Sequence, residues 1–187
     1  MDKRHTRLSR DEWVAGALEV LAEGGAEEVR VEPLARRLGV TKGSFYHHFE
    51  NRQALLDALL ASWEQRGTDA IIDLVEALSD DPALRLRSLV DVVFQADPNG
   101  DAIEVAVRAW ASSDAAVQLI VERVDDRRVG FVADLLIGIG LPSALANRRA
   151  RLLYRVLIGE FIWRSGGGPS STRRELQELA DLLGQLG

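Results

Sequence analysis

Apolar residues recur along most of the chain every three or four positions, which is the spacing of one face of an α-helix. Val14, Ala17, Leu18 and Leu21 are the first such stripe. No segment alternates apolar and polar residues for long enough to favour a β-strand. The pattern therefore predicts an all-α protein, with helices at about 9–24, 31–38, 42–48, 51–66, 68–79, 82–96, 101–112, 114–138, 143–165 and 171–185.

Prolines, glycines and capping residues support these helix boundaries. The spacing of a capping box, in which two residues bond each other's backbone N–H at a helix start, occurs in Ser9 with Glu12 and in Thr172 with Glu175. Four of the five prolines stand where a helix is expected to begin, namely Pro33, Pro82, Pro142 and Pro169. The fifth, Pro98, is interpreted as part of a turn, and Gly67 as the boundary between two helices.

The expected helix at 143–165 is apolar over more than one face. One face contains Leu152, Val156, Gly159 and Trp163, and the adjacent faces are also mainly apolar. Such a helix must be covered on two sides, and the expected helix at 114–138 has the same character. Either both helices are buried inside a monomer, or a second copy of the chain covers one side. We favour a homodimer, with contacts from Leu135, Leu152, Val156, Gly159 and Trp163.

Two short helices near the N-terminus, at 31–38 and 42–48, are separated by a turn that contains Gly39. This arrangement predicts a helix-turn-helix unit. The outer face of the second helix carries small and polar residues, namely Thr41, Lys42, Gly43, Ser44, Tyr46, His47 and His48. A short helix of this kind fits the major groove of DNA, and its N-terminus favours phosphate. Double-stranded DNA is therefore the expected partner.

The charge is distributed unevenly along the chain. The formal net charge is −6, yet residues 1–52 contain nine basic and nine acidic residues, whereas residues 53–187 contain 14 and 20. We place a helix-turn-helix DNA-binding domain at 1–52 and a helical regulatory and dimerisation domain at 53–187. Because the first domain is neutral, its affinity for DNA must come from individual placed side chains.

The N-terminal residues resemble a known family. Residues 9–56, about a quarter of the chain, are similar to the N-terminal domain of TetR-family transcriptional regulators. The similarity is densest in the run Leu34-Ala35-Arg36-Arg37-Leu38-Gly39-Val40-Thr41-Lys42-Gly43-Ser44-Phe45-Tyr46-His47-His48-Phe49-Glu50-Asn51-Arg52. Two residues depart from the pattern. Val31 stands where the family often has Thr or Ser, and Pro33 is less usual in the second helix.

The resemblance implies a role for each matching position on the DNA. Thr41, Lys42 and Gly43 would contact phosphates or base edges. Ser44 and His47 would face the groove. Phosphate contacts would come from Tyr46, His48 and Arg52, of which Arg52 stands where the family usually has lysine.

TetR-like regulators are usually repressors that a small molecule, bound in the C-terminal domain, releases from a palindromic operator. The resemblance implies this function here, with activation or ligand-independent action as the alternatives. Coupling is expected to run through the helix at 51–66. The candidate ligand contacts, each of which has a core position as its alternative, are Trp63, Phe94, Arg108, Trp110 and Phe131. Their aromatic character favours a largely apolar effector.

Other function classes find little support in the sequence. The absence of cysteine excludes disulfides and cysteine-based zinc sites. His47 and His48 point about 100° apart on a helix, so we expect no metal. No nucleotide-binding loop or nucleophile motif is present, so we expect neither enzymatic activity nor a cofactor. A protein-interaction module with a degenerate head would have lost Lys42, Gly43 and Tyr46. Without a membrane-spanning stretch, a cytoplasmic location is expected.

Overall fold

The computed structural model describes residues 8–95 and 97–184, and every regular element in these ranges is helical, as predicted. The expected helix ends at 96 and 185 lie outside the described residues. The elements are α1 (Arg10–Gly24), η1 (Ala26–Glu28), α2 (Val31–Arg37), α3 (Lys42–Phe45), α4 (Arg52–Glu64), η2 (Gln65–Asp69), α5 (Ala70–Leu78), α6 (Pro82–Val93), α7 (Pro98–Ala111), α8 (Ala115–Gly138), α9 (Ser143–Ser165) and α10 (Arg173–Gly184).

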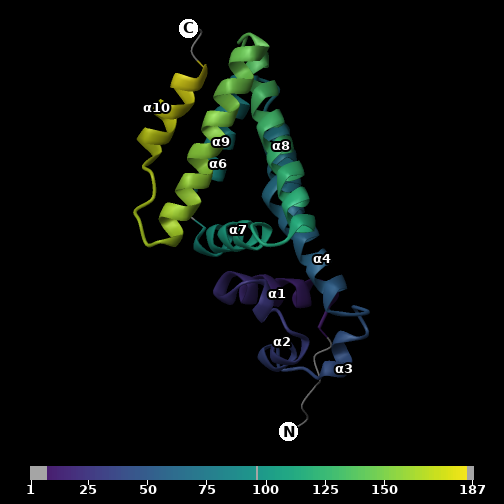
Figure 1. Ribbon diagram of the computed structural model, residues 1–187. Helices are drawn as coiled ribbons and strands as arrows, with labels where there is room; N and C mark the ends of the chain where they lie inside the picture. The colour runs from purple at the N-terminus through teal and green to yellow at the C-terminus, as the bar shows by residue number, and fades with distance from the viewer. Residues whose placement is uncertain (1–7, 96, 185–187) are drawn as a thin grey trace.

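Helices α1, α2 and α3 form the head, at the lower end of the molecule in Figure 1. The predicted capping box begins α1: Ser9 N–H donates to the Glu12 carboxylate at 2.6 Å, and Glu12 N–H donates to the Ser9 hydroxyl at 3.2 Å. Gly39 turns the chain between α2 and α3 at φ 70°, a left-handed conformation that glycine adopts without a Cβ clash. Helix α3 ends at Phe45, and turns continue to His48.

Aromatic rings hold α3 against the rest of the head. The rings of Trp13 and Phe45 meet edge to face at 5.4 Å, and Phe45 stacks on Phe49 at 5.4 Å. All three side chains are almost fully buried. A helix of four residues is not stable alone, so this packing fixes its orientation.

Helix α7 lies crosswise between the head and the long helices α8 and α9 (Figure 1). It packs against α1 on the head side and against α8 and α9 on the other. One apolar cluster runs from Trp13 and Leu21 of α1 to Val107 of α7 and Val121 of α8. This cluster crosses the predicted domain division at residue 52, so the head is seated directly on the body.

A second apolar cluster fills the body between α6, α8, α9 and α10. Helix α10 packs against α6, and Leu176, Ala180 and Leu183 bury its inner face. None of the helices that the structure describes combines the length and the apolar character needed to cross a lipid bilayer.

Gly67 does not separate two helices, contrary to the prediction. Helices α4 and α5 are joined by the π-helical turn η2, which inserts an extra residue into one turn. Thr68 in this turn points inward and is 1% exposed. A Cβ atom on Gly67 would lie 2.8 Å from Nη2 of Arg128, so the missing side chain makes room for that guanidinium group.

Two prolines also differ from their interpretation. Pro98 is the first residue of α7 rather than part of a turn, because a first-turn position needs no N–H donor. Pro169 lies in the segment before α10 and does not begin it. The predicted capping box sets that start instead, with Thr172 N–H donating to the Glu175 carboxylate at 2.7 Å.

Candidate functional sites

The outer face of α3 and the turn after it is largely exposed, as a surface that meets DNA requires. Thr41, Lys42, Gly43, Tyr46 and His47 are exposed, and we refer to these five residues as the α3 surface. Tyr46 is 54% exposed, and its ring touches Phe45 edge on at 5.2 Å. Thr41 accepts a hydrogen bond from the backbone N–H of Ser44 and so caps the helix.

Lys42 is already paired within the head. Its Nζ lies 2.6 Å from Oε1 of Glu32 in α2, and both side chains are exposed. The hydrogen bond and the charge attraction between them raise the pKa of Lys42 and lower the pKa of Glu32. A DNA phosphate would therefore compete with Glu32 for this ammonium group.

Three other predicted DNA contacts are less open. Ser44 is half-buried, and so is His48, whose Nε2 atom is buried without a hydrogen-bond partner in the described structure. The guanidinium of Arg52 donates to the backbone carbonyl of Val29 at 2.7 Å and to that of Ala26 at 2.5 Å. Arg52 thus ties α4 to η1 and to the residue that follows it, a role that the sequence did not indicate.

A group of buried and partly buried polar side chains joins four helices above the head. Trp63 of α4 donates from Nε1 to Oε2 of Glu104 in α7 at 2.8 Å. Arg108 of α7 donates to Glu104 at 2.9 Å and, with two nitrogens, to Asp125 of α8 at 2.7 and 3.1 Å. Arg128 of α8 donates to Glu104 at 3.1 Å. We call these five residues, together with Tyr154 of α9, the polar junction.

The hydroxyl of Tyr154 is shared by three partners in the polar junction. It donates to Asp125 at 2.6 Å and accepts from Arg108 at 2.7 Å and from Arg128 at 3.2 Å. Burial raises the pKa of Tyr154, which keeps the hydroxyl protonated and able to donate. Two guanidinium groups thus face two carboxylates, and the charges of the polar junction balance.

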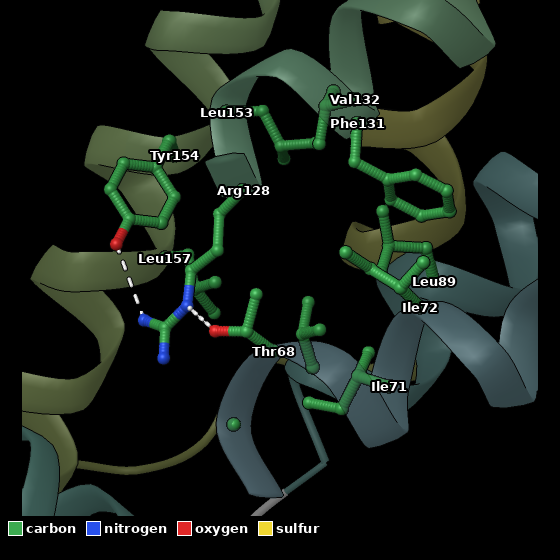
Figure 2. Close-up of a pocket in the computed structure, with 12 residues that line it drawn as sticks. Thr68, Ile71, Ile72, Leu89, Arg128, Phe131, Val132, Leu153, Tyr154 and Leu157 are labelled. Carbon is green, nitrogen blue, oxygen red and sulfur yellow. Dashed lines mark hydrogen bonds between the residues drawn. The ribbon is translucent and has the colours of Figure 1, made fainter. Parts of the chain in front are cut away.

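An apolar cavity of about 60 Å³ adjoins the polar junction, and we call it the inner cavity (Figure 2). Figure 2 shows Thr68 and Arg128 on one side, with apolar side chains around the rest. Nε of Arg128 donates to the Thr68 hydroxyl at 2.8 Å, and this pair closes the polar side. The lining residues come from η2, α5, α6, α8 and α9, so the cavity lies where several helices meet.

The predicted ligand contacts are dispersed rather than gathered. Phe131 lines the inner cavity, whereas Arg108 and Trp63 belong to the polar junction. Phe94 is buried in the body core. Trp110 lines an open groove of about 490 Å³ between α7 and the end of α1.

The predicted dimer contacts form one exposed stripe with one exception. Leu152, Val156, Gly159 and Trp163 are exposed along α9. Leu135 departs from the prediction, because it is 5% exposed within the single chain and packs into the body core.

Sequence reasoning missed the inward-facing polar residues Glu104, Asp125, Arg128, Tyr154 and Thr68. A signal was present for Glu104, which lies three and seven positions before the buried Val107 and Ala111 and so shares their helix face. No comparable pattern marks the others.

Comparisons with known proteins agree with this head and body. Residues 14–59 match the family model described as bacterial regulatory proteins, tetR family. The HTH-type transcriptional regulator BetI of Proteus mirabilis is 28% identical over 153 residues, which cover 80% of this chain and 74% of that protein. The BetI regulator of Yersinia pestis (strain Pestoides F) is 28% identical over 125 residues, 65% of this chain and 63% of its own.

Solved regulators share the fold over nearly the whole chain. A transcriptional regulator from Rhodococcus sp. Rha1 is 24% identical, with a TM-score of 0.74 over 94% of each chain. A regulator from Saccharomonospora viridis in complex with choline is 18% identical, with a TM-score of 0.76 over 93% of this chain and 94% of its own. Residues 14–59 thus match the tetR-type head, the related regulators are HTH-type transcriptional regulators, and the fold of the chain is that of solved transcriptional regulators, so the chain is similar to TetR-family DNA-binding regulators.

Proposed function

We propose that the protein is a repressor that binds a palindromic operator as a homodimer and leaves it when a small, largely apolar effector binds the body. On this proposal it acts in the cytoplasm, without enzymatic activity and without a cofactor or metal. The observation that carries the proposal is the position of α7, which packs on α1 of the head and, through Glu104 and Arg108, bonds the polar junction beside the inner cavity.

DNA contact is supported by the exposure of the α3 surface. Lys42, Tyr46 and His47 are exposed on α3 and its following turn, and Figure 1 shows α3 at the end of the molecule away from α8, α9 and α10. Their donors suit phosphates and base edges, and Gly43 has no side chain to keep the backbone away from DNA.

The homodimer is supported by the stripe on α9. Leu152, Val156 and Trp163 are large apolar residues that one chain leaves exposed, and Gly159 between them permits close approach of a second helix. Exposed apolar surface of this kind marks an interaction site, and a two-fold pairing would place the same stripe on both chains. Two heads related by this symmetry would read the two halves of a palindrome.

Effector binding is supported by the inner cavity and by the choline complex of the similar Saccharomonospora regulator. The cavity is small, so a bound molecule must push its walls apart. Arg128 and Tyr154 line it and bond partners on α7 and α8. A shift of these two side chains would displace α7 and, through α1, the head. The ligand would therefore bind one arrangement of the two heads more tightly than the other.

In vitro transcription tests the proposal. The DNA sequence that the purified protein selects from a random pool is placed in a promoter, and transcripts are measured with and without protein. The proposal requires fewer transcripts with protein and recovery on addition of a binding effector. More transcripts with protein would identify an activator, and no recovery with any bound ligand would overturn effector release.

A further inference from the structure

We propose that the effector is an uncharged, mainly hydrocarbon molecule with a single hydrogen-bond acceptor, and that the hydroxyl of Thr68 recognises that acceptor. The proposal rests on the proposed function, since it concerns the molecule that the regulator senses. It adds the charge of the effector and names a specificity-determining residue.

The lining of the inner cavity indicates that the effector is uncharged. Arg128 carries the one charge among the lining residues, and its side chain is 11% exposed. Its guanidinium already faces Glu104, and the neighbouring Arg108 faces Asp125. In the inner cavity, an anionic group would have to compete with Glu104, and a cationic group would meet Arg128 without a free carboxylate in the lining. Burial of a charge without a counter-charge is strongly unfavourable, so a neutral ligand fits best.

The acceptor follows from the hydrogen bonds of Thr68. This hydroxyl is almost fully buried, and in the described structure its one hydrogen bond is accepted from Nε of Arg128. The hydroxyl proton therefore has no acceptor among the described residues. Tyr154 cannot serve in its place, because its own proton is donated to Asp125. A buried donor without an acceptor is unfavourable, and a ligand carbonyl or ether oxygen would satisfy it.

The shape of the effector follows from a neighbouring cavity. A space of about 260 Å³ lies beside Trp63 and Phe161, and we call it the outer cavity. Its lining also includes Arg66, Asp97 and Asp101, of which Asp101 is paired with Arg164. The two cavities share Gly67, Ile71 and Val93 as a common wall. Rotation of Ile71 or Val93, whose side chains form part of this wall, would join the two spaces. The combined volume suits an unbranched chain with its acceptor beside Thr68.

The first test compares three molecules of equal chain length on the purified full chain. Binding of 2-octanone, octanoate and octyltrimethylammonium is measured by titration calorimetry. We expect 2-octanone to bind at least about tenfold more tightly than either charged compound. Equal or tighter binding of a charged compound overturns the proposal, and so does the absence of binding by all three.

The second test isolates the hydroxyl. Thr68→Val keeps the shape and removes the donor, so affinity for 2-octanone should fall roughly 3- to 10-fold. Thr68→Ser keeps the hydroxyl and should retain the affinity. An equal loss in both variants, or none in either, overturns the assignment of Thr68. If Thr68→Val does not fold, Thr68→Ala, which also removes the hydroxyl, takes its place, and retention of full affinity in that variant overturns the assignment.

The third test locates the bound molecule. Leu89 and Leu84 lie on the same helix, but Leu89 lines the inner cavity, whereas Leu84 is half exposed. Leu89→Phe should fill the cavity and abolish 2-octanone binding, and Leu84→Phe should leave it unchanged. Binding retained by a folded Leu89→Phe places the ligand elsewhere and overturns the proposal.

Release of DNA is measured separately, so that the two proposals fail differently. If 2-octanone binds as described and the protein stays on its operator, the proposed release by an effector is contradicted, whereas the proposed recognition of a neutral ligand in the cavity is supported. If a charged compound binds and releases the DNA, the proposed repressor function stands and the neutral effector is contradicted.

Discussion

Trp63 donates a hydrogen bond of 2.8 Å to Glu104, and this contact links the helix that leaves the head to the helix that separates the head from the cavity. The two residues are 41 positions apart, and both are almost fully buried. Arg128, which lines the inner cavity, shares the same carboxylate at 3.1 Å. Movement of Arg128 at the cavity would therefore act on α7 through one hydrogen bond and on α4 through a second.

Removal of this bond should loosen the connection. Trp63→Phe keeps an aromatic ring and leaves one oxygen of Glu104 without its donor, so the free energy of unfolding should fall by about 1–3 kcal/mol. Urea denaturation measures the change. Trp110→Phe is the matched control, because the ring N–H of Trp110 has no hydrogen-bond partner among the described residues. An equal loss in both variants would attribute the effect to ring size and contradict the role of the hydrogen bond.

Glu32 should restrain DNA binding through its ion pair with Lys42. Glu32→Gln frees the ammonium and removes a negative charge beside the α3 surface, so the protein should bind DNA roughly 3- to 10-fold more tightly at low salt. The gain should shrink as salt increases. Fluorescence anisotropy measures both. Glu178→Gln, on the distant α10, changes the net charge by the same amount and should leave DNA affinity unchanged. An equal gain in affinity in this variant would show that net charge, and not the ion pair with Lys42, causes the effect.

Arg52 should contribute to stability as well as to any contact with DNA. Its two bonds to backbone carbonyls brace α4 against η1. Arg52→Ala should lower the free energy of unfolding by about 2–3 kcal/mol, because a charged donor is lost from two carbonyls. The neighbouring Gln53→Ala should change it little. Weaker DNA binding with unchanged thermal stability would instead show that Arg52 acts on DNA alone.

The stripe on α9 should hold two chains together. Val156→Glu places a charge at the centre of the exposed apolar residues and should convert a dimer into a monomer. Sedimentation velocity separates the two states. Leu84→Glu, on an exposed position of α6, should leave the dimer intact. A wild-type protein that is monomeric at micromolar concentrations would contradict the proposed assembly.

Local signals predicted the features that depend on neighbouring residues. The capping boxes at Ser9 and Thr172 set helix starts as expected, and the run from Thr41 to His48 predicted an outer face of small and polar residues. These features depend on residues within one or two turns of each other. These features can therefore be predicted without knowledge of the fold.

The polar junction and the inner cavity depend on contacts between distant helices. Arg128 reaches Thr68 across 60 positions, and Arg108 reaches Tyr154 across 46. Periodicity indicates which face of a helix is buried, but not the angle at which two helices cross. Charged residues are also usually exposed, so Glu104 and Arg128 did not stand out as interior groups. The π-helical turn at Gly67, which turns Thr68 inward, left no signal that differs from an ordinary helix end.

Selection of DNA from a random-sequence pool, with wild type and Tyr46→Phe in parallel, tests the central claim most directly. The wild type should enrich a palindrome, and Tyr46→Phe should bind that palindrome more weakly by about 1–3 kcal/mol. Because Tyr46 is exposed, the melting temperature of the Tyr46→Phe variant should equal that of the wild type. Failure of the wild type to enrich any sequence above nonspecific binding, or a Tyr46→Phe variant that binds the palindrome as tightly as the wild type, would contradict the account.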